Sequence, residues 1–253
     1  MTTRYNTVAD GRKRHNIGPD PMAAADLKTF FDFYRKHPSR RLAGFFGDIG
    51  RRDTNTELLS RALRANTTTN CLVIGCAHWA NPRDLGRFLS KIQPATQARI
   101  TALDVLPHAL VEAVRRGVDF IPLLTPAQAT PFVSSFFDIL VADGLLNCCH
   151  FEQHEPIVRE MARIAKPHAL VLLGLAHAPE NRVVRAPERA MPAYCRPLGD
   201  FQQMFRRAGF DFPEGSSVET TFGKESDVRI ENCIATKRAG RRPSRVSNNG
   251  GDA

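Results

Sequence analysis

Residues 69–89 read TNCLVIGCAHWANPRDLGRFL, and this stretch contains three structural signals in succession. Residues 71–74 form a short apolar run with β-branched side chains, which predicts a buried strand. Gly75 follows at once, and the apolar positions of residues 82–92 then recur at helical spacing. A strand, a tight turn of small residues and a helix predict the first βα unit of a doubly wound sheet. A ligand is expected at the carboxyl end of that strand.

The chain continues this alternation on the carboxyl side of the stretch. Short apolar runs are separated by segments with helical spacing, and the links between them are short. This pattern predicts an α/β fold: a doubly wound, mostly parallel seven-stranded sheet with an antiparallel last strand pair and an N-terminal helical cap. The expected strands are 71–74, 99–104, 119–124, 139–142, 169–173, 217–222 and 230–236, and the expected helices between them are 82–92, one that starts after Pro107, 155–164 and 199–208.

Composition divides the chain into three parts. Residues 1–65 are expected to form an N-terminal arm and a helical cap or lid, in which residues 40–52 are interpreted as a glycine-containing loop. Residues 66–238 form the α/β core, and their proline- and arginine-containing segment 176–198 is long for a connection, which is typical of a functional loop. Residues 239–253 are mostly Gly, Arg, Ser and Asn, a composition typical of a disordered tail.

The positive charge of the chain is concentrated at its ends. Of a formal net charge of +9, residues 237–253 contribute +4 and residues 1–20 contribute +2, which leaves +3 for the residues between them. Because a basic tail can bind phosphates, a nucleic-acid partner stays open, although a solvated tail is the favoured interpretation. The core itself carries no charge signal that selects a class of ligand.

Several classes of protein are disfavoured by composition. No apolar run approaches the roughly 20 residues of a membrane helix, and the N-terminus shows no apolar signal segment. The six cysteines include no Cys-x-x-Cys pair, and none is followed by a histidine at zinc-finger spacing, so no metal site is expected. We therefore expect a cytoplasmic protein without a membrane partner, whose cysteines serve as small apolar residues.

The second expected strand ends in Asp104, where an acidic side chain can accept hydrogen bonds from a ribose. Asp104 could also serve only as the N-cap of the next helix.

Residues 75–80 can be aligned with the glycine fingerprint of nicotinamide dehydrogenases, with Asp104 downstream. We do not favour that class, because the chain has no Tyr-x-x-x-Lys pair and ends in two expected antiparallel strands.

Five segments together resemble the class I S-adenosylmethionine-dependent methyltransferases, over about residues 55–238. Their departures from the family pattern are concentrated in the first loop, where Ala77 and Trp79 stand in place of glycines and Val73 in place of an acidic residue. His168-Ala169 also replaces the usual Gly-Gly pair. The matching segments are 72–79, 101–110, 131–144, 161–173 and 201–210.

The resemblance implies S-adenosyl-L-methionine as cofactor. Gly75 and Asp104 match the glycine-rich loop and the acidic ribose ligand of the family, and Gln128 is the polar residue nearest to the missing adenine ligand, where Pro126 stands. Trp79 is expected to turn outward, against Phe45 or Phe46. The implied cofactor-binding residues are Gly75, Cys76, Ala77, Asp104, Val105, Gln128 and Asp143.

The methyl acceptor is expected beyond the fourth strand, where residues 147–151 lead into a helix. His150 is the first candidate for a general base and His154 the second, because the pKa of histidine lies near neutrality. A polar helix entrance is the competing interpretation of His150. Tyr194 and Arg196 lie in the 176–198 segment, where the family often builds its acceptor pocket, and they are the candidate substrate-binding residues.

The preferred hypothesis is an S-adenosylmethionine-dependent methyltransferase that acts on a small molecule at oxygen or nitrogen. The adjacent cysteines 148 and 149 lack the Pro-Cys context of RNA cytosine methylation, and no Asn/Asp-Pro-Pro-Tyr sequence follows the fourth strand. Two alternatives stay open. One is an RNA or protein methyltransferase that uses the basic termini, and the other is a non-catalytic methyltransferase-like binding domain.

Overall fold

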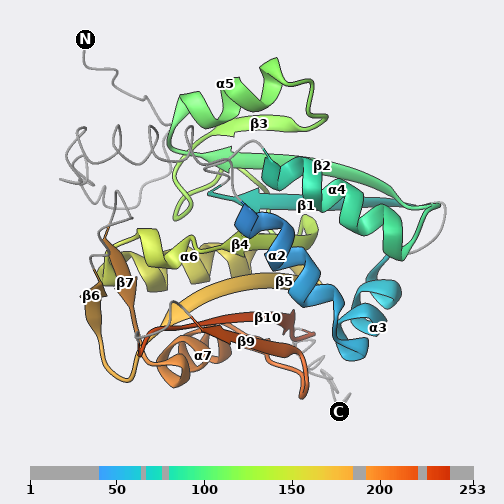
Figure 1. Ribbon diagram of the computed structural model, residues 1–253. Helices are drawn as coiled ribbons and strands as arrows, with labels where there is room; N and C mark the ends of the chain where they lie inside the picture. Colours follow the sequence, from blue (N-terminus) through green and yellow to red (C-terminus); the bar gives the residue numbers. More distant parts are fainter. Residues whose placement is uncertain (1–39, 64–66, 76–79, 185–191, 222–226, 240–253) are drawn as a thin grey trace, which may run out of the picture.

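The computed structural model describes residues 40–63, 67–75, 80–184, 192–221 and 227–239 (Figure 1). Several expectations lie outside these residues: residues 1–39 of the N-terminal arm and helical cap, the loop residues Cys76, Ala77 and Trp79, and the tail from residue 240.

One eight-stranded sheet forms the centre, in the order β3-β2-β1-β4-β5-β10-β8, with β9 also paired to β10. The pairs from β3 to β5 are all parallel, and β10 runs antiparallel to its neighbours β5, β8 and β9. The strands are β1 (Thr68–Ile74), β2 (Gln97–Asp104), β3 (Ile121–Leu124), β4 (Phe137–Asp143), β5 (Ala165–His177), β8 (Phe210–Asp211), β9 (Ser217–Thr221) and β10 (Arg229–Lys237).

The predicted fold class is confirmed, and the strand count differs by one. The sequence predicts seven strands, whereas two short strands share the outer edge of β10 in the structure: β9 pairs with its first half and β8 with its last two residues. A two-residue strand such as β8 carries no periodic signal, so the sequence pattern could not reveal it.

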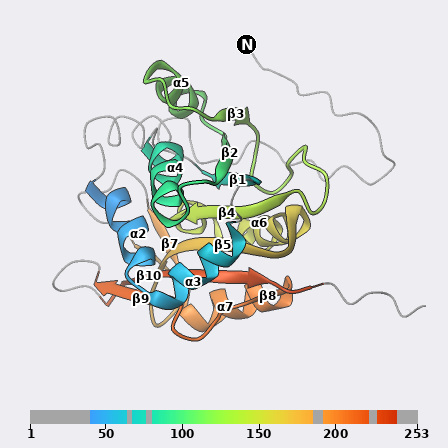
Figure 2. The same ribbon diagram turned by 90° about the vertical axis from the view of Figure 1, so that its right-hand side faces the viewer.

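Helices cover both faces of the sheet, which separates two apolar cores. On one face lie α2 (Arg40–Gly50), α3 (Asp53–Ala62) and α4 (Ala80–Ile92), and on the other lie α6 (Phe151–Ile164) and α7 (Leu198–Arg207). Figure 2 shows α2 and α4 on one side of the strands and α6 on the other. The helix α5 (Pro107–Arg115) packs against β2 and β3.

The prediction of a loop at residues 40–52 is wrong, because α2 (Arg40–Gly50) is helical. Phe45, Phe46 and Ile49 are buried in the core between this helix and the sheet, while the three glycines are exposed. The buried side chains supply the stability that the glycines lack, since tertiary packing commonly outweighs weak helix propensity. Together with α3, this segment completes the helical layer on its face of the sheet.

The predicted strands and helices otherwise correspond to observed elements, with shifted ends. β5 begins at Ala165, so it includes the residues that resemble the family's Gly-Gly turn. There His168 adopts a φ of +64°, and the pairing register with β4 shifts between Phe137 and Ile139. A non-glycine residue at positive φ shows that the backbone keeps the turn although the glycine is gone.

Within segment 176–198, a two-stranded sheet of β6 (Arg182–Val184) and β7 (Ala193–Cys195) lies beside the end of β5. A short 3-10 helix, η1 (Leu146–Cys148), follows β4 and contacts β7. None of the helices in the described ranges has the length and apolar character that crossing a membrane requires.

Candidate functional site

The centre of the site is the carboxyl end of β1, where the order of the sheet reverses direction between β1 and β4. Gly75 follows β1 there with a φ of +67°, and its N–H donates to the carbonyl oxygen of Leu103 at 3.0 Å. A Cβ atom at this position would lie 2.7 Å from Cδ1 of Leu145. Both the conformation and the close approach therefore require glycine.

Asp104 ends β2 beside this turn and is only 5% exposed. Its Oδ1 accepts a hydrogen bond of 2.9 Å from the N–H of Leu106, the N-cap residue of α5. The competing interpretation of Asp104 as the N-cap of the next helix is wrong, because Leu106 is the N-cap residue and no side chain caps α5. The position of Asp104 at the carboxyl end of β2 suits contact with a ligand that binds at this edge of the sheet.

Two further expected cofactor residues lie at the same corner. Val105 follows Asp104 directly and is 54% exposed. Gln128 lies half-buried in the turn after β3, and the N–H of Thr125 in that loop donates to the carbonyl oxygen of Asp104 at 3.1 Å. The structure therefore gathers Gly75, Asp104, Val105 and Gln128 at one end of the sheet.

Asp143, at the carboxyl end of β4, belongs to a row that continues across β5 and into the first half of the antiparallel β10. It lies directly opposite Gly174 of β5, which lies opposite Asn232 of β10. A side chain on Gly174 would collide with the carboxylate of Asp143, so the glycine makes room for it. The amide of Asn232 donates to Oδ2 of Asp48 in α2 at 3.1 Å. Sequence reasoning missed Asn232 and Asp48, because only the pairing of β10 brings them to this edge.

His150 and Tyr194 meet beyond β4. Nε2 of His150 lies 2.9 Å from the hydroxyl oxygen of Tyr194, within hydrogen-bond distance. His150 is also the N-cap residue of α6, and its backbone N–H donates to Oε1 of Gln153 at 3.2 Å. The ring of His150 thus projects from a fixed helix start toward a buried tyrosine.

His154 differs from His150, because both of its ring nitrogens are engaged inside the protein. Nε2 lies 3.0 Å from the carbonyl oxygen of Cys149, and Nδ1 accepts a hydrogen bond of 3.0 Å from Nε of Arg196. The side chain is fully buried. Burial lowers its pKa to about 4, an effect to which the nearby Arg196 contributes. His154 is therefore a neutral, positioned residue.

Arg196 has two further contacts in the protein. Its Nη2 donates to the carbonyl oxygen of Phe151 at 2.8 Å, and its guanidinium lies 4.9 Å from the centre of the Phe151 ring. It also lines a polar groove of about 470 Å³ between α6 and α7. The structure thus ties Arg196 to the start of α6 and places it beside His154.

Asn147 connects these residues to the sheet, a role that sequence reasoning missed. The side chain is buried; its amide donates to the carbonyl oxygens of Ala176 at 2.7 Å and Tyr194 at 3.0 Å, and its oxygen accepts from the N–H of Ala176 at 2.7 Å. The local sequence carries no signal for this role, because Asn147 lies in η1, beyond the end of β4. These three bonds fix β7, and with it Tyr194, against β5.

Comparison with known proteins agrees with this arrangement. Residues 72–173 match a family model described as a methyltransferase domain. These residues run from β1 through the middle of β5 and include Gly75, Asp104 and His150. No curated protein matches the chain.

Solved structures share the fold at low sequence identity. A SAM-dependent methyltransferase from Methanosarcina mazei is 16% identical in sequence, with a TM-score of 0.57. The alignment covers 72% of this chain and 97% of the methyltransferase chain. The cyclase SpnF is 15% identical with a TM-score of 0.54, covering 74% of this chain and 81% of its own.

A third structure is the 1,6-didemethyltoxoflavin-N1-methyltransferase of Burkholderia thailandensis, with bound 1,6-didemethyltoxoflavin and S-adenosylhomocysteine. It is 17% identical in sequence, with a TM-score of 0.52, and the alignment covers 88% of this chain and 94% of the Burkholderia chain. Residues 72–173 therefore match a methyltransferase domain, and the described core has the fold of S-adenosylmethionine-dependent methyltransferases of known structure.

Proposed function

We propose that this protein transfers a methyl group from S-adenosylmethionine to an oxygen or nitrogen atom of a small molecule. The observation that carries the proposal is that Gly75 and Asp104 lie side by side at the carboxyl ends of β1 and β2, next to the point where the strand order reverses. Gly75 adopts a left-handed backbone conformation after β1, and the carboxylate of Asp104 at the end of β2 is held by the N–H of Leu106. Both features suit a ligand that contains a ribose.

The residues present fit the cofactor. Asp104 would accept hydrogen bonds from the ribose hydroxyls, and the absence of a side chain at Gly75 lets the backbone approach the ligand closely. Val105 and Gln128 lie where the base would be held, and Asp143 faces the carboxyl edge of β4. The loop residues Cys76 and Ala77 stay predictions. When bound, the cofactor supplies an electrophilic methyl group on a positively charged sulfur.

On the acceptor side, we assign the role of general base to His150. For an oxygen acceptor, the acceptor oxygen forms the new bond to the methyl carbon, the carbon–sulfur bond breaks, and the acceptor proton moves to Nε2 of His150. In the free protein the hydroxyl of Tyr194 lies 2.9 Å from that nitrogen, and the acceptor would replace it there. His154 is not retained as a base, because its ring is fully buried between the carbonyl oxygen of Cys149 and Arg196. We assign to Arg196 the positioning of His154 and of the start of α6.

A small acceptor is supported by the enclosure of the His150–Tyr194 pair and by a relative named for methylating 1,6-didemethyltoxoflavin. Tyr194 is 7% exposed and is itself part of the β6–β7 sheet, opposite Val183. A polynucleotide would need an open surface at this point. The free thiols of Cys71 and Cys233 are buried, which agrees with the proposed cytoplasmic location.

The deciding experiment has two stages. Calorimetric titration of the full chain with S-adenosylmethionine and S-adenosylhomocysteine should show binding of both at one site. Transfer of a labelled methyl group to a panel of phenols, amines and hydroxylated heterocycles then tests catalysis. The second stage is necessary because one protein of this fold is named as a cyclase. Absence of binding in the first stage would contradict the proposal, and binding without any transfer would favour a non-catalytic domain.

A further inference from the structure

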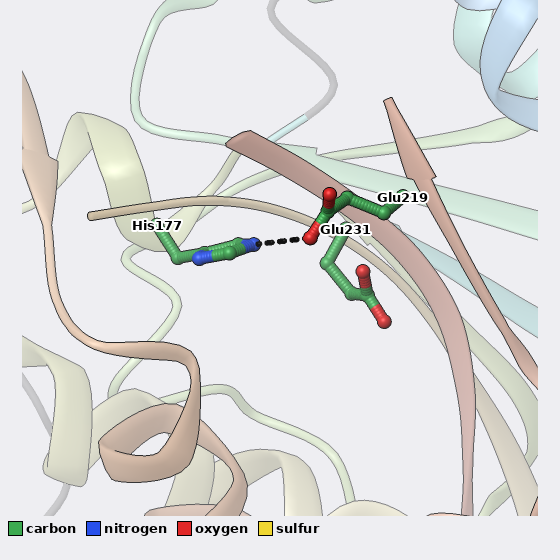
Figure 3. A group of neighbouring side chains, drawn as sticks. All are labelled: His177, Glu219 and Glu231. Atoms are coloured by element: carbon green, nitrogen blue, oxygen red, sulfur yellow. Dashed lines mark ion pairs between the residues drawn. The ribbon is translucent and has the colours of Figure 1, made fainter. Parts of the chain in front are cut away.

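A histidine and two glutamates converge at the carboxyl end of β5, outside the site described above. His177 is the last residue of β5, Glu219 lies in β9 and Glu231 in β10. Glu219 and Glu231 are directly opposite in the register, and Glu231 is opposite Leu175, two residues before His177. Residues opposite one another, and residues two apart along a strand, project from the same face. The three side chains therefore share one face, as Figure 3 shows.

The ligand atoms of this cluster lie within 4.8 Å of one another. Nε2 of His177 is 3.9 Å from Oε2 of Glu219, which is longer than a hydrogen bond. The three residues are supplied by three adjacent strands of the sheet, so their backbones are held by the ladder. A strand framework of this kind fixes the ligands more firmly than a surface loop could.

The cluster contains polar groups that no hydrogen bond satisfies within the described residues. Glu231 is only 5% exposed, and in the described residues no hydrogen bond or ion pair reaches its carboxylate. Nε2 of His177 is buried and has no hydrogen-bond partner there either. Arg229 lies directly opposite His177 in the register, yet no ion pair joins it to either glutamate within the described ranges. A buried carboxylate without a partner is costly, which points to a missing positive ligand.

We propose that His177, Glu219 and Glu231 bind a divalent transition-metal ion of the zinc type. One imidazole nitrogen and two carboxylate oxygens form a donor set that zinc accepts, whereas magnesium and calcium prefer oxygen ligands alone. Zinc bonds of about 2.1 Å in a tetrahedron place ligand atoms roughly 3.4 Å apart, and rotation of the glutamate side chains can close the present spacing. A fourth position stays open for water or another ligand.

Charge supports the same assignment. Two carboxylates and a neutral imidazole carry a charge of −2, which a divalent ion balances. No local pattern signals this cluster, because His177, Glu219 and Glu231 are far apart in the chain and share no motif spacing.

The test is calorimetric titration of chelator-treated full-length protein with zinc chloride, with thermal unfolding measured in parallel. The parent should bind one zinc ion at this site and unfold at a higher temperature when zinc is present. Glu231→Gln and His177→Gln should each weaken zinc binding at least tenfold. The matched control is His168→Asn: this histidine is exposed in the turn at the start of β5, and asparagine tolerates its positive φ. It should leave zinc affinity unchanged.

Thermal unfolding in chelator distinguishes loss of the site from loss of the fold. Glu231→Gln removes an unpartnered buried charge, so the metal-free variant should unfold at the same temperature as the parent or higher. A parent that binds no zinc would overturn the proposal. It would equally be overturned if Glu231→Gln and His177→Gln retained the affinity of the parent, or if His168→Asn lost zinc to the same extent as they do. None of these readouts depends on methyl transfer.

Discussion

Nε of Arg196 donates a hydrogen bond of 3.0 Å to Nδ1 of His154, a contact between β7's end and α6. Because the guanidinium can only donate, Nδ1 must be the accepting nitrogen. Nε2 then carries the proton and donates to the carbonyl oxygen of Cys149 at 3.0 Å. The pair thus fixes one neutral tautomer and joins the start of α6 to the segment that carries Tyr194.

The first prediction concerns the pH dependence of stability. Burial lowers the pKa of His154 from 6.5 to about 4. The unfolded chain therefore binds the proton first as the pH falls, so the contribution of His154 is complete above pH 6.5 and is lost progressively down to about pH 4. We expect about 2 kcal/mol of this loss between pH 7 and 5, measured by urea denaturation.

The control for this prediction is His154→Gln, whose amide can donate to the Cys149 carbonyl without titrating. The difference in pH dependence between parent and variant isolates the histidine. NMR titration of the ring gives a second measurement that needs no variant, and an ordinary pKa near 6.5 would show that the ring is not buried in solution as it is in the structure.

The second prediction concerns Asp104. Asp104→Asn keeps an oxygen that can accept from the N–H of Leu106, so the entrance to α5 should be preserved. The charge that would hold the ribose is lost, and S-adenosylmethionine binding should weaken by about 1.5–3 kcal/mol, the range for hydrogen bonds to charged groups. Calorimetry measures the affinity, with circular dichroism as the check on folding. Equal affinity in parent and variant would remove Asp104 from the cofactor site.

The third prediction compares two glycines with the same backbone conformation. Gly75 has a φ of +67° and Gly117 a φ of +65°, but only at Gly75 would a Cβ meet a neighbour, 2.7 Å from Leu145. Gly117→Ala should cost about 1–2 kcal/mol of unfolding free energy for the left-handed conformation alone. Gly75→Ala should cost more and should also weaken cofactor binding. Chemical denaturation of both variants measures the difference, and equal costs would mean that Leu145 moves aside freely.

The fourth prediction separates catalysis from helix capping at His150. Asparagine is a favoured N-cap residue, so His150→Asn should preserve the start of α6 and the affinity for S-adenosylmethionine. Transfer to an oxygen acceptor should fall by about 10²–10⁴-fold, the usual contribution of a general base. Tyr194→Phe removes the hydroxyl that lies 2.9 Å from Nε2 and should give a smaller loss. Full transfer by His150→Asn would leave this histidine with the capping role alone.

The fifth prediction concerns the basic tail. With a small acceptor, deletion of residues 239–253 should leave turnover nearly unchanged and nearly independent of salt. With RNA as acceptor, binding would weaken steeply as salt is added, and the deletion would flatten that dependence. Turnover and binding between 50 and about 200 mM salt distinguish the two cases.

The sequence by itself determined the layered α/β fold and one corner of the site. The strand at 68–74 is buried along most of its length, and runs of this kind are visible as apolar, β-branched segments. Gly75 and Asp104 stand directly at strand ends, so their place at the carboxyl edge follows from chain order alone. The helix α2 was missed because three glycines lower its propensity, and only the burial of its phenylalanines against the sheet makes it stable.

Tertiary structure decided how residues on separate strands and loops combine. Nothing in the local sequence distinguishes His150 from His154. In the structure His150 projects toward Tyr194, whereas His154 is held in a neutral state between the carbonyl oxygen of Cys149 and the guanidinium of Arg196. The row of Asp143, Gly174 and Asn232 likewise exists only through strand register. The physical reason is the range of the interactions: periodicity and turn chemistry act over a few residues, whereas burial, hydrogen-bond partners and charge pairs are set by segments that meet only in the folded chain.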